Sequence, residues 1–340
     1  MRRRLISACE NITARAIGDF EPNDDLLDAA EQTIFQIGND LVTTGPSNPR
    51  EVFERYPGGV KALLDPTKGP KGLATPFTRF NQMTGGLRPG QLMVIASRPS
   101  MGKTALGLDI ALGVTTRKGT DEQAETALVF SMEMSEQEIL QRLLCSVAHV
   151  DSNRYRAGQL DSEERRRLNA ALGELDRSRL LIDDRADTTL MQIGAKCRRA
   201  KSQQGLGLVI VDYLQLLGSS NRPENRTQEV AAFSRGLKRL AMDLRVPVIA
   251  LSQLNRAVEG RADKRPGLGD LRDSGSIEQD ADIVALLFRE EYYKPDKETL
   301  RGLAELNVAK HRSGPTGTIA LTFIGKYTTF ENPMPPERVA

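Results

Sequence analysis

A short stretch, residues 91–104, joins an apolar run to a loop that could bind phosphate. Leu92 to Ala96 is apolar throughout, and the following residues lead into Gly102-Lys103-Thr104. Apolar residues then recur at helical spacing. A strand, a tight loop and a helix with this junction are typical of a P-loop, whose backbone N–H groups and helix N-terminus bind phosphate. The predicted nucleotide-binding residues are Ser97, Arg98, Pro99, Ser100, Met101, Gly102, Lys103, Thr104 and Ala105.

Two side chains of this loop have expected roles. Lys103 can reach the β- and γ-phosphates of ATP, and Thr104 can bind Mg²⁺. The P-loop pattern has Gly where this chain has Ser97. Ser is small enough to keep the turn tight. The alternative is an ordinary strand-to-helix turn that contains Gly-Lys-Thr by chance.

Three further polar residues follow apolar strands. Asp212 ends the run Leu208–Val211, Glu133 follows Ala127–Phe130, and Gln253 follows Val248–Leu251. In a parallel sheet these positions lie at the carboxyl edge, where a nucleotide binds. We expect Asp212 to complete the Mg²⁺ site, Glu133 to accept a proton from water, and Gln253 to sense the γ-phosphate. A capping role for Asp212 and a solvated turn for Glu133 are the alternatives.

Basic, Gly-rich stretches could bind a phosphate backbone. One covers Arg261–Gly267 and Asp270–Ser276, and a second is Gly218–Arg226. Aromatic residues make up only 5% of the chain and Trp is absent. Backbone contacts are therefore expected rather than base stacking. Solvated loops are the alternative for both stretches.

The elements that must position these residues form an α/β pattern. Strands and helices alternate from Gly72 to Glu331, which predicts a mostly parallel sheet with helices on both faces. The last three strands, from Leu303 onward, are expected to close the sheet in antiparallel fashion. Before this domain, residues 1–18 predict a helix that is the remnant of a longer helical region, and residues 19–70 a linker. Within the linker, Asp25–Ile37 predicts a short amphipathic helix, whose apolar stripe packs on its own domain or docks on a neighbouring subunit. Residues 71–332 are predicted to be the motor domain and 333–340 a tail.

Composition limits the class of protein. The 340 residues are 39% hydrophobic and 27% charged, with a formal net charge of +2, so any nucleic-acid binding requires local basic groups. The three cysteines have no metal or disulfide spacing, which indicates a reducing, cytoplasmic setting, and two histidines make a histidine metal site improbable. No signal peptide or membrane span is predicted.

At these motifs the chain resembles the replicative DnaB-type helicases of bacteria and phages, with their RecA-like P-loop motor domain. The resemblance covers about residues 70–332 in order and spacing, and Ser97 is a residue type that the family accepts. The motifs that carry it are Ala96–Thr104, Phe130–Met134, Val211–Gln215, Leu251–Arg256, Asp270–Asp282 and Lys310–Pro315.

The resemblance implies a role for each residue. Lys103, Thr104 and Asp212 would bind ATP and Mg²⁺, Glu133 would be the catalytic base and Gln253 the γ-phosphate sensor. Lys310 and Arg312 would enter the ATP site of the neighbouring subunit, with Arg312 as arginine finger. His311 stands where relatives usually have Gln. The residues that match the loop holding single-stranded DNA are Arg272, Asp273, Ser274 and Gly275.

It also implies partners and a direction of movement. Family members are homo-hexameric rings that move 5′ to 3′ on single-stranded DNA, are placed there by a loader, and meet primase through an N-terminal collar. Here that collar is largely absent from the sequence, so the primase contact is doubtful. Two rival functions stay open: a RecA- or RadA-like recombination ATPase that forms filaments, and an assembly module in which ATP only joins subunits. The linker helix, the Lys310–Arg312 pair and the complete set of ATPase residues favour the ring helicase.

Overall fold

The chain divides into two compact units, Met1–Pro70 and Lys71–Ala340. The computed structural model describes residues 2–18, 26, 29–30, 33, 48–56, 64–65, 72–116, 124–186, 188–212 and 223–333, and of the side chains at 2, 4, 55, 223–227 and 272–276 nothing is stated. Among these residues, no helix combines the length and the apolar character needed to span a bilayer. Of the predicted loop 218–226, residues 223–226 are described and form the start of helix α11, Pro223–Leu244, so the prediction was wrong for that part. Of the predicted tail, only residue 333 is described.

The first unit contains two described helices. Helix α1 spans Arg2–Gly18, as the apolar spacing predicts. Helix α3, Pro49–Arg55, lies in a stretch expected to be irregular, and that expectation was wrong. The side chain of Asn48 accepts a hydrogen bond from the backbone N–H of Glu51, and proline occupies the first turn, which together start the helix. Of the predicted helix 25–37, only Leu26, Ala29, Ala30 and Thr33 are described, and all four are helical.

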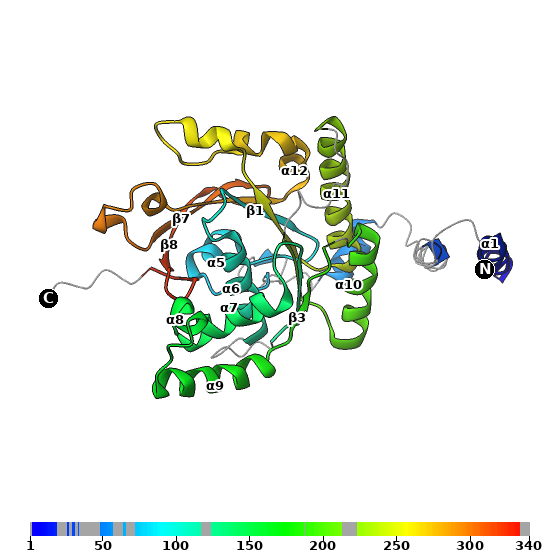
Figure 1. The fold of residues 1–340 in the computed structure, drawn as a ribbon. Coiled ribbons are helices and arrows are strands. Elements are labelled where there is room, and N and C mark those ends of the chain that lie inside the picture. Colours follow the sequence, from blue (N-terminus) through cyan, green and yellow to red (C-terminus); the bar gives the residue numbers. More distant parts are fainter. Residues whose placement is uncertain are drawn as a thin grey trace. The chain divides into compact units, whose positions relative to one another are not determined.

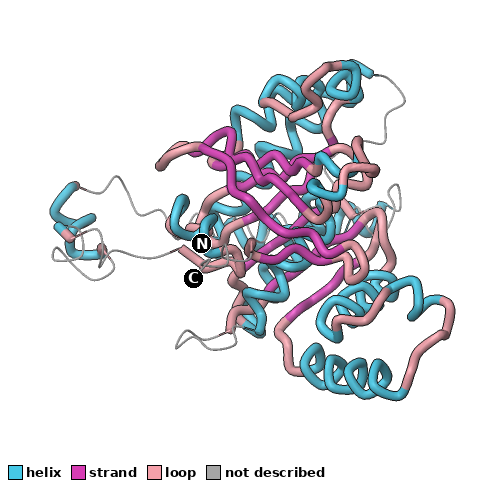
Figure 2. The backbone as a smooth tube through the Cα atoms, turned by 90° about the vertical axis from the view of Figure 1, so that its left-hand side faces the viewer, coloured by secondary structure: helices cyan, strands magenta, loops and turns pink. Residues whose placement is uncertain are grey.

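The second unit is built on a nine-stranded sheet with the order β3-β2-β4-β5-β1-β6-β7-β8-β9, seen from the side in Figure 2. Its first six strands pair in parallel and the last three run antiparallel, which confirms the predicted mixed sheet. The strands are β1 Leu92–Ser97, β2 Ala127–Ser131, β3 Leu180–Asp183, β4 Leu208–Asp212, β5 Val248–Gln253, β6 Ile283–Phe288, β7 Leu303–His311, β8 Gly317–Ile324 and β9 Thr329–Glu331.

Helices cover both faces of this sheet (Figure 1). The α-helices of the second unit are α5 Thr78–Thr84, α6 Lys103–Thr116, α7 Glu136–Ala148, α8 Ser152–Arg156, α9 Ser162–Asp176, α10 Leu190–Gln204, α11 Pro223–Leu244 and α12 Gly275–Asp280. The 3-10 helices are η4 Arg256–Gly260, η5 Leu268–Ser274, η6 Glu290–Tyr292 and η7 Glu298–Leu300. Sequence patterns did not predict α5 and α8, which are only seven and five residues long.

Alternation along β1 shows how the two layers form. Met93 and Ile95 pack into one core with α5, α6 and α7, whereas Leu92, Val94 and Ala96 pack into a second core with α10, α11 and α12. All six residues of this strand are buried. Such a strand, buried on both faces, reads as a continuous apolar run, as is usual for parallel sheets. The carboxyl end of β1 is therefore held rigidly, and the loop after it starts from a fixed point.

The last strand is tied to the P-loop helix by one carboxylate. Asp109 of α6 accepts hydrogen bonds from the backbone N–H of Phe330 at 2.7 Å and from the Thr329 hydroxyl at 2.9 Å. Removal of the carboxylate from water raises the pKa of Asp109 to about 7, although the two hydrogen bonds oppose the shift. This contact keeps β9 against α6.

Asp109 should make stability depend on pH. Because its folded pKa is raised, the folded chain binds more protons than the unfolded chain between about pH 4 and pH 7, so this group's contribution falls as pH rises through that window. In Asp109→Asn, the free energy of unfolding should depend less on pH between about 5 and 7.5 than in the wild type. Denaturant unfolding at each pH measures this. The exposed Asp296→Asn is the matched control, and an identical slope in Asp109→Asn and wild type would contradict the assignment.

Candidate nucleotide site

Lys103 is the first residue of α6, and its side chain lies between two carboxylates. Its Nζ is 2.7 Å from Oδ1 of Asp212 and 3.3 Å from Oε2 of Glu133. Lys103 is 8% exposed and Asp212 is 1% exposed. The three residues come from the ends of three separate segments, after β1, at the end of β4 and after β2. The sheet therefore brings together residues that are up to 109 positions apart.

Thr104 and Asp212 provide oxygen atoms for a hard cation. The Thr104 hydroxyl donates to Oδ2 of Asp212 at 2.5 Å, so both oxygens lie within reach of a single ion. Mg²⁺ prefers oxygen ligands and is usually held by one or two carboxylates together with phosphates and water. Among the described residues, no group of three or more His, Cys, Asp or Glu side chains could hold a metal. The residues thus fit an ion that is shared with a nucleotide rather than an all-protein metal cage.

Register explains why Gln253 lies beside the loop. Parallel pairing of β1 with β5 places Ser97 next to Gln253, and pairing of β2 with β4 places Ser131 next to Asp212. The backbone N–H of Met132 also donates to the carbonyl of Asp212 at 2.8 Å. The ends of four neighbouring strands, β2, β4, β5 and β1, thus carry the predicted ATPase residues along one edge.

Ser97 and Arg98, at the start of the predicted loop, have well-defined surroundings. Ser97 is buried and belongs to β1, and its backbone is not in the left-handed region where glycine is favoured, which explains why serine is accepted there. The Arg98 side chain contacts the segment after β5. Its Nη1 donates to the carbonyl of Leu254 at 2.7 Å, and its Nε forms an ion pair with Glu259 at 2.8 Å. Arg98 therefore joins the loop to the segment after β5.

Glycine is needed at position 102. Its φ is +97°, and a Cβ atom there would lie 3.0 Å from the ring of Phe330. Ser100 adopts a positive φ of 65° without being glycine, and its carbonyl accepts a hydrogen bond from Arg289 at 3.4 Å. Close packing of Phe330 of β9 on the loop therefore leaves little room for a side chain at position 102.

Sequence patterns missed a pocket of about 420 Å³. Its lining includes Met134, which is the neighbour of Glu133, together with residues of α7, α8 and the turn between β8 and β9. Burial and the nearby Arg156 lower the pKa of Arg142, which also lies within electrostatic reach of Asp212. Tyr155 and Tyr327 add aromatic rings. Nothing in the spacing of these residues identified them, because α8 and the β8–β9 turn meet α7 only in the folded chain.

The remaining predicted residues lie away from this cluster. Lys310 ends β7 together with His311, and Arg312 follows. Both side chains donate hydrogen bonds to backbone carbonyls of α12. Arg272, Asp273 and Ser274 lie in η5, and Gly275 begins α12, so the predicted DNA-contacting run passes directly into that helix.

The strand order, the P-loop and the carboxylates at its edge define a RecA-like P-loop ATPase domain. Comparison with known proteins narrows this class: the DnaB-like helicase C-terminal domain family matches residues 72–332, and the chain belongs to the DnaB family of replicative DNA helicases. It is accordingly an ATP-dependent enzyme and not a recombination ATPase of the RecA type.

Two curated relatives and two solved structures illustrate the similarity. Replicative DNA helicase DnaC of Bacillus subtilis is 42% identical over 332 residues, which covers 97% of this chain and 72% of the relative. DnaB of Geobacillus stearothermophilus is 41% identical with the same coverages. One solved structure, an isolated ATPase domain, superposes with a TM-score of 0.77 at 36% identity, covering 85% of this chain and all of that chain. A DnaB-like replicative helicase studied for its interactions with primase gives a TM-score of 0.75 at 34% identity, covering 98% of this chain and 76% of that chain.

Replacement of Gly102 by Ala should damage this site. The added methyl group meets both an unfavourable backbone conformation and the Phe330 ring, a strain on the order of 1–3 kcal/mol. We expect weaker ATP binding by calorimetry and a lower melting temperature. Gly173→Ala in α9, where nothing lies within 4 Å of the added Cβ, is the control and should be neutral or slightly stabilising. Wild-type ATP affinity and stability in Gly102→Ala would show that the turn does not need glycine.

Proposed function

We propose that this chain is the motor of a homo-hexameric ring that hydrolyses ATP between subunits and moves 5′ to 3′ on single-stranded DNA to unwind the replication fork. The observation that carries the ATPase part is the convergence of Lys103, Thr104, Asp212 and Glu133 at one edge of the sheet. Lys103 would bind the β- and γ-phosphates, and Thr104 with Asp212 would hold Mg²⁺, which neutralises phosphate charge. The neighbouring pocket, with its tyrosine rings and arginines, would receive the base and ribose.

Within this site, Glu133 would orient and deprotonate the attacking water. Its carboxylate is 39% exposed, in contrast to that of Asp212, so water can reach it. The cationic Lys103 beside it is a partner for the carboxylate form that a base requires. Gln253, at the end of the neighbouring strand β5, would report the γ-phosphate to the segment that follows it.

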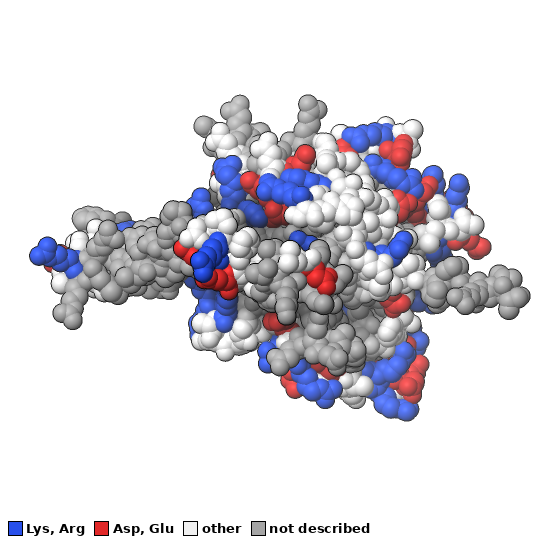
Figure 3. Space-filling model, turned by 180° about the vertical axis from the view of Figure 1, so that it is seen from behind, with Lys and Arg blue, Asp and Glu red and all other residues white. Residues whose placement is uncertain are grey.

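Contact with DNA is assigned to the run from Arg272 to Gly275, which joins η5 to α12. Lys, Arg, Asp and Glu side chains lie in interspersed groups on the face shown in Figure 3, in keeping with a net charge of only +2. DNA binding would therefore depend on a local contact with the backbone of one strand.

A helicase loader and primase are the further partners. One structural relative is described together with primase.

Glu133→Gln should separate ATP binding from turnover. The amide keeps the size of the side chain but cannot accept a proton from water, and a general base contributes on the order of 10²–10⁴-fold. We expect ATP affinity within a few-fold of wild type and hydrolysis reduced by about that factor, measured by calorimetry and phosphate release. Glu136→Gln, an exposed position a little further along the chain, is the matched control. Wild-type turnover in Glu133→Gln would remove it from the mechanism.

Arg272→Ala should weaken binding of single-stranded DNA by a similar factor for every sequence, because a phosphate contact carries no base information. The slope of log K against log salt concentration should become shallower by about one unit, the change expected for one lost phosphate contact. Fluorescence anisotropy with two unrelated oligonucleotides at several salt concentrations measures both effects. Arg301→Ala, exposed at the end of η7, is the control. An unchanged slope in Arg272→Ala would move the DNA site elsewhere, with residues 218–226 next.

Arg312 tests whether ATP is hydrolysed between subunits. Lys103→Ala lacks a working P-loop but can donate Arg312, whereas Arg312→Ala keeps the P-loop but donates nothing. Each variant alone should be inactive, because arginine fingers contribute roughly 10³–10⁵-fold. Mixing them under verified subunit exchange should restore DNA-stimulated ATPase activity at interfaces that hold every part. A mixture that stays inactive would place Arg312 outside the neighbour's site.

A further inference from the structure

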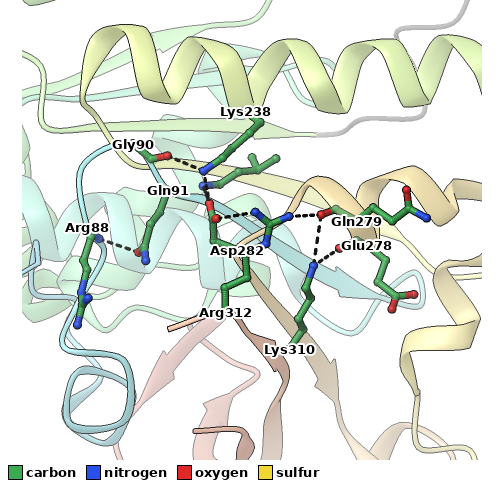
Figure 4. A network of polar contacts seen from close by, with 10 residues as sticks. Arg88, Gly90, Gln91, Lys238, Glu278, Gln279, Asp282, Lys310 and Arg312 are labelled. Carbon is green, nitrogen blue, oxygen red and sulfur yellow. Dashed lines mark hydrogen bonds and ion pairs between the residues drawn. The ribbon is translucent and has the colours of Figure 1, made fainter. Parts of the chain in front are cut away.

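Lys310 and Arg312 are held by the last carbonyl groups of α12 (Figure 4). Nζ of Lys310 donates to the carbonyls of Glu278 and Gln279, and Nη2 of Arg312 donates to the carbonyl of Gln279. The final carbonyls of a helix have no partner within the helix and carry its negative dipole end, so they attract cations. Burial and the charge of Arg312 lower the pKa of Lys310.

Asp282, two residues beyond α12, contacts the same guanidinium. Its Oδ1 lies 3.6 Å from Nη1 of Arg312. Its Oδ2 accepts hydrogen bonds from the backbone N–H of Leu92 at 2.8 Å and from Nζ of Lys238 at 2.6 Å. The Asp282 side chain is 11% exposed, whereas that of Arg312 is 48% exposed. The carboxylate is therefore anchored in the protein, and the guanidinium is held at its surface.

Lys238 determines what this ion pair does to Arg312. Lys238 reaches Asp282 from α11 and also donates to the carbonyl of Gly90 at 2.9 Å, so it is fixed in place. Lys238 is the nearer cation, at 2.6 Å from Asp282 against 3.6 Å for Arg312, so it offsets part of the negative charge that Asp282 presents to Arg312. The carboxylate can therefore orient the guanidinium without holding it in a close ion pair.

The backbone of Arg312 is fixed separately from its side chain. Its N–H donates to the carbonyl of Asp282 at 2.9 Å, next to the pairing of Ile283 with His311 between β6 and β7. The direction of the guanidinium is set by different groups, the Asp282 carboxylate and the end of α12. These contacts use only Nη1 and Nη2, and a guanidinium has five N–H donors. Donors thus remain for a phosphate approaching from outside the subunit.

We propose that Asp282 is the positioning residue for Arg312, with Lys238 as its compensating charge and the last carbonyls of α12 as the second support. This inference rests on the proposed role of Arg312 in the neighbouring subunit's ATP site. Since α12 begins at Gly275, the end of the DNA-contacting run, the helix links that run to the pair that reaches the neighbour. A shift of the run would therefore move the carbonyls that hold Lys310 and Arg312.

The mixing assay of donor and acceptor tests the proposed role of Asp282 when a second substitution is placed in one of the two proteins at a time. The donor is Lys103→Ala and the acceptor is Arg312→Ala. Asp282→Asn added to the donor should lower the restored ATPase kcat by about 10- to 100-fold, the scale expected for a misplaced catalytic group, with KM for ATP little changed. Lys238→Met in the donor should have the same effect, because Asp282 would then pair with Arg312 alone. Lys238 is more exposed than Asp282, so its replacement should disturb folding less. Lys294→Met, an exposed cation paired with Glu290, is the donor control and should restore full activity.

Whether ATPase activity is lost with Asp282→Asn in the donor or in the acceptor distinguishes a positioning role of Asp282 from a general structural role. In the acceptor, Asp282 still accepts the backbone hydrogen bond from Leu92 at the start of β1, so a purely structural role would harm the acceptor at least as much. A loss confined to the donor supports the proposal. Equal losses on both sides, or an Asp282→Asn donor that restores parental activity, would overturn it. The parent mixture is measured first, and if it is inactive the proposed role of Arg312 between subunits fails, and this inference with it.

Discussion

The geometry of the candidate ATP site depends on the contact of Lys103 with Asp212 and Glu133. A primary amine lies between two carboxylates at distances of 2.7 and 3.3 Å, in a site where the amine and one carboxylate are almost fully buried. Burying such charges is costly unless they are paired and hydrogen-bonded. The fold supplies that pairing by ending β4 at Asp212, by placing Glu133 after β2 and by starting α6 at Lys103. The same charges suit a nucleotide with its metal, since each has a phosphate or cation partner of opposite sign.

A second group of paired charges surrounds Asp282, apart from the Lys103 cluster. Asp282 follows α12 and forms ion pairs with Lys238 at 2.6 Å and with Arg312 at 3.6 Å. Both carboxylates belong to residues that contact neighbouring elements through backbone hydrogen bonds as well: the carbonyl of Asp212 accepts from Met132, and the Asp282 carboxylate accepts from Leu92. Helix α12 begins at the end of the run that we propose contacts DNA, so this run and the support of the proposed arginine finger belong to one continuous segment of chain.

Local patterns predicted the parts of this molecule that local physics determines. The apolar runs before Ser97, Asp212 and Gln253 became β1, β4 and β5, because a strand buried on both faces must be apolar throughout. Short elements were harder. Helix α3 was missed, although Asn48 followed by proline is a recognisable start signal. Contacts between distant residues could be predicted only for the side chains expected at the carboxyl edge of the sheet, such as Lys103 and Asp212. Arg98 lies within the P-loop sequence, yet its partner Glu259 is 161 residues away, and the partners of Arg312 depend on where α12 packs.

The central claim is that the Lys103 cluster is the ATP site, and a structure of the assembled protein with Mg²⁺ and a non-hydrolysable ATP analogue tests it most directly. The account predicts that Nζ of Lys103 contacts the β- and γ-phosphates, with one Mg²⁺ about 2.1 Å from the Thr104 hydroxyl and on the side of Asp212. Glu133 would face the γ-phosphate, and a guanidinium from the adjacent subunit would approach it. A nucleotide bound elsewhere, with Lys103 still paired to Asp212 at 2.7 Å, would contradict the account.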